Sequence, residues 1–140
     1  MTKTMRQWIL RANAIFLLAA GTTGLLMDVL ANSFARGPFA RLVSGAPYMA
    51  IGTTEAHGLA LILGVLLWRA VPVRSWHLTA VAVHVLLGTA NLVFWQVFVA
   101  ADFLAAGYIT TSLHGLFVVL ELSAATAASR AGALDDYVAA

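Results

Sequence analysis

The chain has 140 residues, of which 61% are hydrophobic and only 10% are charged, with a formal net charge of +2. A soluble domain carries about 25% charged residues, so this composition has too few charges to cover a surface in water and favours lipid as the surrounding medium. Eight Lys and Arg residues against six Asp and Glu residues exclude a nucleic-acid-binding footprint. The absence of cysteine excludes disulfides, thiolate metal sites and iron–sulfur clusters.

Four apolar runs follow one another along the chain, each long enough to cross the hydrocarbon core of a bilayer. The first follows a basic stretch, but it is longer than the apolar region of a signal peptide, so we interpret it as a retained transmembrane helix. The predicted helices span about 12–30, 49–68, 76–99 and 108–129. Residues 31–48 are predicted to form an extracytoplasmic loop with a short interfacial segment, and residues 130–140 a polar cytoplasmic tail. The whole chain is expected to form one domain.

The basic residues predict the orientation of the chain in the membrane. Six of them fall on one side of the predicted spans and two on the other, namely Lys3, Arg6, Arg11, Arg69, Arg74 and Arg130 against Arg36 and Arg41. Because cytoplasmic segments carry the excess of Lys and Arg, both termini are predicted to be cytoplasmic, in the inner membrane if the source is bacterial. The expected partners are the lipid bilayer and a second copy of the chain or a larger membrane complex.

Two short patterns occur twice along the chain. Thr-Thr-x-x-His-Gly-Leu begins at Thr53 and again at Thr110, and Trp-x-Leu-x-Ala-x-Ala begins at Trp8 and again at Trp76. The chain therefore resembles two copies of one helical hairpin, and an even number of spans per copy gives a parallel repeat. The predicted fold class is all-α, an up-down-up-down bundle of four transmembrane helices built from two such hairpins.

Polar side chains inside membrane segments are costly and usually face the interior of a bundle. Here they form two predicted layers. The outer layer contains Asp28, Glu55, His57, Asn91 and His114, with Trp95 one turn beyond Asn91, and the inner layer contains Asn13, His84 and Glu121. Within the inner layer, His84 and Glu121 lie at similar depth and are expected to pair, whereas His77 is expected at the membrane interface. A hydrogen-bond network that only fixes the bundle is the alternative to a functional site.

The repeat places His57 and His114 on diagonal helices at one depth, facing each other. Two facing imidazoles are the arrangement that binds a b-type haem through both axial positions. The leading hypothesis is therefore haem b between His57 and His114, used for membrane electron transfer as in an oxidoreductase. Direct metal binding by the same two histidines is a variant of this hypothesis.

Two other classes of function remain open. The first is an acid–base enzyme, or a binding protein, for a lipid-like hydrophobic small molecule, with His84 and Glu121 as the catalytic pair and Asn91 and Trp95 lining the pocket. His57 with Asp28 or Glu55 is an alternative acid–base pair, and Asn13 would also line the site. The second is a transporter or an accessory subunit of a larger complex, in which the polar layers relay protons or form part of a pore.

Overall fold

The computed structural model describes the backbone of residues 1–139 and the side chains of residues 1–130. Its helices are α1 (Lys3–Phe34), α2 (Ala40–Gly45), α3 (Met49–Arg69), α4 (Arg74–Val93), α5 (Trp95–Ala100) and α6 (Leu104–Ala139). Four of them are long and apolar enough to cross a membrane: α1, α3, α4 and the Leu104–Arg130 part of α6. The predicted all-helical class with four candidate membrane spans is therefore confirmed.

Helix α1 is longer than the sequence predicts, because it begins at Lys3 rather than near residue 12. Thr2 caps it, with its hydroxyl oxygen accepting a hydrogen bond from the backbone N–H of Met5 at 3.2 Å. The helix ends at Phe34, after which Ala35 adopts a left-handed conformation and donates its N–H to the Leu30 carbonyl. The basic stretch at the start of the chain is thus part of the first long helix.

The third predicted helix, 76–99, is interrupted. Helix α4 ends at Val93, Phe94 leaves the helical conformation with φ −101° and ψ 31°, and the chain resumes as the short helix α5. Helix α5 packs against the start of α6, with the Trp95 ring 4.9 Å from that of Tyr108. Gly107 allows this close approach, because a Cβ there would lie 2.8 Å from the Phe98 ring.

Helix α6 in turn continues to Ala139, through the residues predicted as a polar tail.

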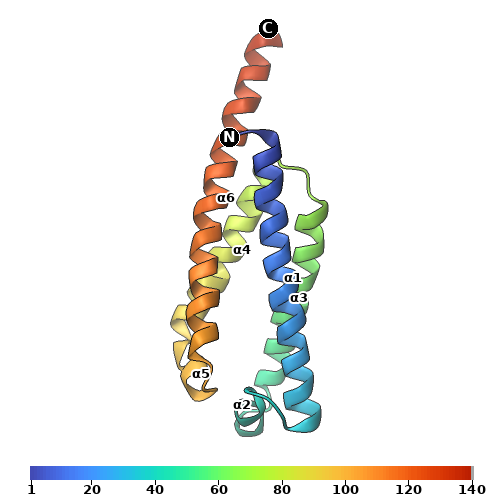
Figure 1. The fold of residues 1–140 in the computed structure, drawn as a ribbon, viewed down its shortest axis with the longest axis vertical. Coiled ribbons are helices and arrows are strands. Elements are labelled where there is room, and N and C mark those ends of the chain that lie inside the picture. Colours follow the sequence, from blue (N-terminus) through green and yellow to red (C-terminus); the bar gives the residue numbers. More distant parts are fainter. Residues whose placement is uncertain (140) are drawn as a thin grey trace.

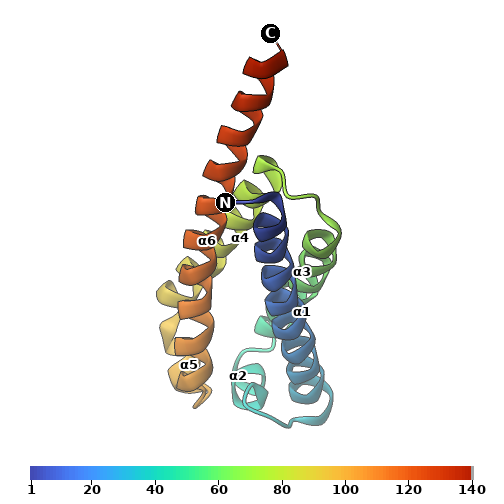
Figure 2. The same ribbon diagram turned by 45° about the horizontal axis from the view of Figure 1, so that its top comes forward.

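The long helices pack as two hairpins, α1 with α3 and α4 with α6, as both views show (Figures 1 and 2). The N-terminus and the α3–α4 connection lie at one end of the molecule, which we call the amino-terminal end. Helices α2 and α5 lie at the opposite end, the α2–α5 end, toward which the hairpins diverge (Figure 1). The hydrophobic core that joins the hairpins contains Leu10, Ala14, Leu17, Ala60, Leu67, Ala70 and Ala80.

The distribution of polar groups is the reverse of that in a soluble protein. Large hydrophobic side chains are exposed along all four long helices, for example Leu26, Ile62, Leu86 and Val119. The described buried polar and charged residues are Arg6, Asn13, Asp28, His77, His84, His114 and Glu121. An apolar exterior around a polar interior is what a bundle surrounded by lipid requires.

Candidate functional site

Five buried polar side chains form one hydrogen-bonded group where the two hairpins meet, and we call it the five-residue network. Its members are Asn13 from α1, His77 and His84 from α4, and His114 and Glu121 from α6. Four of them have no exposed surface, and His114 is 7% exposed. The sequence brings them together because His77 and His84 are seven residues apart in α4, as are His114 and Glu121 in α6. This spacing places each pair on one face of its helix.

The bonds run in order along the network. Nδ1 of His77 lies 2.5 Å from Oε2 of Glu121, and Nδ2 of Asn13 donates to the other oxygen, Oε1, at 2.8 Å. The Asn13 carbonyl oxygen lies 2.7 Å from Nε2 of His84, and Nδ1 of His84 lies 2.8 Å from Nδ1 of His114. Both oxygens of the Glu121 carboxyl group and both nitrogens of the His84 ring are therefore engaged.

The amide of Asn13 fixes the direction of these bonds. An ionised carboxylate only accepts hydrogen bonds, so the Asn13 amide presents its NH₂ to Glu121 and its oxygen to His84. The oxygen accepts, so Nε2 of a neutral His84 carries the proton and its Nδ1 accepts from Nδ1–H of His114. The N–H groups of His114, His84 and Asn13 thus point in sequence toward Glu121, and bonds aligned in this way polarise and strengthen one another.

Glu121 has no Lys or Arg partner among residues 1–130, and its only ionisable partner is His77. A net charge in an apolar interior is costly. Contact with an imidazole that can donate a hydrogen bond lowers the cost of burying the carboxyl group. In addition, Nε2 of His77 is buried without a hydrogen-bond partner. The Glu121–His77 pair is thus a buried contact between an acid and an imidazole, in which one ring nitrogen has no partner among the described residues.

Two aromatic rings, Phe16 from α1 and Phe117 from α6, pack against the histidines of the network. The ring of Phe16 lies 5.4 Å from that of His114 and 6.0 Å from that of His84. The ring of Phe117 stacks on His84, with centroids 5.1 Å apart and planes 19° apart. These contacts fix both imidazoles and fill the space beside them with apolar groups, so they leave no room for a bulky ligand at these faces of the rings.

The structure adds detail to two expectations about the inner layer. The His77 side chain is fully buried and bonds to Glu121, while its depth at the membrane interface stays a prediction. The expected direct pairing of His84 with Glu121 is wrong, since Asn13 lies between them and bonds to both. The signal for His77 was present in the sequence, because it shares one face of α4 with His84 and Asn91.

A second polar contact, the Asp28–His57 pair, lies nearer the α2–α5 end, between α1 and α3. Oδ2 of Asp28 lies 2.7 Å from Nδ1 of His57, and Oδ1 is buried without a partner. The His57 ring fills the space above Gly24, where a Cβ would lie 2.1 Å from it. Phe39, which precedes α2, lies parallel to the ring within 10°, with centroids 6.4 Å apart, and also contacts Phe103. The His57 side chain is 27% exposed.

His57 and His114 contact α1 at different levels. His57 lies against Gly24, whereas His114 lies against Phe16. These two positions of α1 are eight residues apart, about 12 Å along the helix at the usual rise. Each histidine is also bonded to a neighbour in its own hairpin, His57 to Asp28 and His114 to His84.

The difference in level follows from the register of the two hairpins. The repeated tryptophans are 68 positions apart, so the repeat assigns Leu92 of α4 as the counterpart of Gly24. His114 instead faces His84 and Gly88. The α4–α6 hairpin is thus shifted by about one to two turns relative to the α1–α3 hairpin at this position.

The remaining predicted residues lie outside the five-residue network. Asn91 is half-buried and donates to the hydroxyl oxygen of Thr110 at 3.1 Å. Trp95 packs within the α5–α6 contact, and Glu55 is exposed on α3. The structure therefore brings four of the predicted site residues, Asn13, His84, His114 and Glu121, into one network with His77, and pairs Asp28 with His57.

Within residues 1–130, no group of three or more His, Asp or Glu side chains is arranged to hold a metal ion. Comparisons of the chain with models of protein families, with curated proteins and with solved structures find no match.

Proposed function

We propose that this protein transfers protons inside the membrane, with Glu121 as the group that takes up and releases the proton and His77 as its exchange partner. The observation that carries the proposal is the Glu121–His77 contact, in which a fully buried carboxyl group has an imidazole as its only ionisable partner among residues 1–130. Chains of Asp, Glu and His inside membrane proteins are typical of proton pathways. His84 and His114, linked to Glu121 by Asn13, extend the polar path toward the middle of the bundle.

Burial favours the proton over a larger substrate. Asn13, His77, His84 and Glu121 have no exposed surface, so no lipid-like molecule reaches the predicted acid–base pair in this arrangement. A proton needs only a hydrogen-bonded neighbour or a single water molecule. The acid–base enzyme acting on a hydrophobic small molecule is therefore less well supported than proton transfer by the same residues.

The proposal includes an orientation of the four helices and both termini in the membrane. The excess of basic residues at the amino-terminal end supports an up-down-up-down bundle with both termini in the cytoplasm. His77 is the fourth residue of α4, near that end, so the Glu121–His77 pair would exchange protons with the cytoplasm. The partner with which proton transfer is coupled would be a second copy of the chain or another subunit of a membrane complex.

A proton-flux measurement tests the proposal. Purified protein is reconstituted into liposomes that contain a pH-sensitive dye, and a potassium gradient with valinomycin drives proton movement. We expect a flux several times that of protein-free liposomes in the wild type, and the protein-free rate in Glu121→Gln. The glutamine side chain keeps the shape of Glu121, and its oxygen can still accept from Asn13, but it cannot carry a proton.

The matched control is Glu55→Gln, the same change at an exposed glutamate on α3. This variant should conduct protons at the wild-type rate, and all three proteins should unfold at similar temperatures. A wild-type flux no greater than that of empty liposomes would overturn the proposal, as would an undiminished flux in Glu121→Gln. In either case the five-residue network would have only a structural role.

A second candidate is haem b binding for electron transfer. The observation that favours it is the Asp28–His57 contact, because a carboxylate on Nδ1 orients an imidazole and leaves Nε2 free to ligate iron. A bound haem would supply one-electron transfer. The separation of His57 and His114 along α1 opposes it, since two axial ligands must meet on opposite sides of one iron.

An absorbance spectrum separates the two candidates. If haem is bound, protein purified after expression with a supply of haem shows a Soret band that is lost in both His57→Ala and His114→Ala. A colourless preparation would exclude the haem candidate and leave proton transfer unaffected. Loss of the band in only one variant would assign that histidine as the ligand and exclude the predicted pair.

A further inference from the structure

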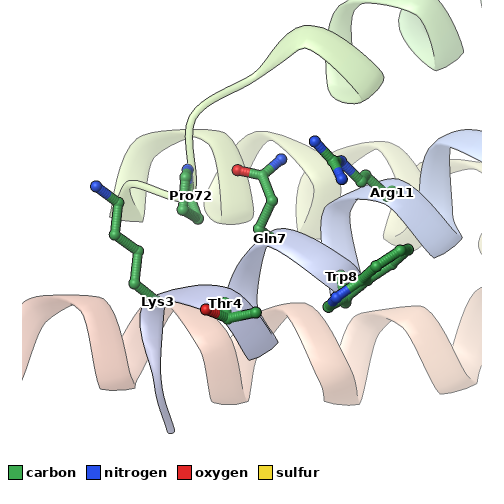
Figure 3. A pocket seen from close by; sticks show the side chains of 6 residues that line it. All are labelled: Lys3, Thr4, Gln7, Trp8, Arg11 and Pro72. Carbon is green, nitrogen blue, oxygen red and sulfur yellow. The ribbon is translucent and has the colours of Figure 1, made fainter.

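A cavity of about 250 Å³ lies at the amino-terminal end of α1, outside the five-residue network. It is lined by Lys3, Thr4, Gln7, Trp8 and Arg11 from α1 and by Pro72 from the α3–α4 connection (Figure 3). The α1 residues recur every three or four positions, so they form one stripe along the first turns of the helix. The cavity is therefore an elongated groove with a cationic side chain toward each end.

Arg11 is held in a fixed position at the end of the groove nearer the middle of α1. Its guanidinium lies 5.5 Å from the ring of Trp8 and 5.5 Å from the ring of Trp68, so two aromatic faces flank it. Its Nε is buried without a hydrogen-bond partner. Neither ring neutralises the charge. Arg11 is thus a cation flanked by two aromatic rings, with the guanidinium charge left for an anionic ligand.

No carboxylate among residues 1–130 neutralises Lys3 or Arg11. The two ion pairs in this part of the chain are His57 with Asp28 and His77 with Glu121, and both lie elsewhere. Two unpaired cations beside a cavity attract an anion. Among the described residues, the positive charges of Lys3 and Arg11 thus favour an anionic ligand at this cavity.

Hydrogen bonds to the α3–α4 connection fix the other wall of the groove. The Gln7 side-chain amide donates to the Ala70 carbonyl oxygen at 3.0 Å, and Nε of the buried Arg6 donates to the Pro72 carbonyl oxygen at 3.4 Å. Gln7 keeps its own carbonyl oxygen and a second N–H, which are available to a ligand with hydroxyl groups. The groove is thus preformed rather than assembled from mobile side chains.

We propose that this groove binds the phosphodiester headgroup of an anionic phospholipid, such as phosphatidylglycerol. Lys3 and Arg11 are eight residues apart, about 12 Å along α1, so a phosphate with an attached glycerol matches the length of the groove better than a free phosphate ion does. Trp8 and Trp68 are 60% and 46% exposed, as expected for rings at the headgroup level of a bilayer. Basic pockets between membrane helices bind anionic headgroups in this way.

Lipid-dependent unfolding of the purified protein in a neutral detergent tests the proposal. A ligand that binds only the folded state raises the unfolding temperature, and the rise grows with the logarithm of the ligand concentration above its Kd. We expect phosphatidylglycerol to raise the unfolding temperature by several degrees and phosphatidylcholine to leave it unchanged. Sodium chloride at about 0.5 M should remove most of the rise by screening. A rise produced by millimolar inorganic phosphate and not by the lipid would overturn the proposal in favour of a free anion.

Variants that remove a positive charge test whether the lipid-dependent shift in unfolding temperature arises at Lys3 and Arg11. Arg11→Gln and Lys3→Gln should each reduce the lipid-dependent shift at least twofold, and the double variant should lose it. Arg41→Gln, at an exposed arginine of α2, is the matched control and should keep the full shift. Equal loss in the control, or a full shift in the double variant, would overturn the assignment. If Arg11→Gln does not fold, Arg11→Lys keeps the charge without the planar guanidinium and should retain part of the shift.

Discussion

Nδ1 of His77 lies 2.5 Å from Oε2 of Glu121, in a position where neither side chain has any exposed surface. One residue comes from α4 and the other from α6, so the contact joins the two helices of the second hairpin at its polar centre. The inner polar layer consists of residues of this hairpin together with Asn13 of α1. Helix α3 contributes no polar side chain to it, because the repeat makes Gly64 the counterpart of Glu121.

The first prediction concerns how His77 and Glu121 together affect the free energy of unfolding. His77→Leu leaves a buried Glu121 without its ionisable partner and should lower the free energy of unfolding by about 3 kcal/mol. The double variant His77→Leu with Glu121→Leu removes both groups and should be more stable than His77→Leu alone. Unfolding by SDS in mixed micelles measures both values. Equal or greater destabilisation in the double variant would show that the two side chains do not share a charge.

The second prediction compares two asparagines that each bond across helices. Asn13→Leu leaves both Glu121 and His84 without a partner and should cost about 1 to 3 kcal/mol of the free energy of unfolding. Asn91→Leu removes a single bond to Thr110, whose hydroxyl also donates to the Ala106 carbonyl oxygen, and should cost about 0.6 kcal/mol. Urea or SDS titrations of the two variants check the order, and a larger cost at Asn91 would contradict it.

The sequence predicts the helices well and their ends less well, for physical reasons. A run of apolar residues must be helical to satisfy its backbone in lipid, which identifies the four spans. The ends depend on individual contacts: Thr2 extends α1 toward the N-terminus, and the chain leaves α4 at Phe94 without a proline or glycine to mark the break. Boundaries of this kind are not encoded in hydropathy.

The candidate site was predictable as a set of residues but not as a set of pairs. Spacing along each helix indicated that Asn13, His84 and Glu121 face inward. Which residues meet depends on the register between helices, and register is set by close contacts such as that of Gly88 with His114. The repeated motif suggested one register for both hairpins, whereas the contacts of His57 and His114 differ.

The third prediction uses glycines that differ in their surroundings. A Cβ at Gly24 would lie 2.1 Å from the His57 ring, so Gly24→Ala must displace that ring from Asp28 and should cost about 1 to 3 kcal/mol of the free energy of unfolding. Gly58, the next residue after His57, has nothing within 4 Å of its Cβ position, and Gly58→Ala should not destabilise the protein, because alanine favours the helix. Thermal unfolding in detergent compares the two variants. If both behave alike, Gly24 does not accommodate His57, and the α1–α3 register derived from that contact must be revised.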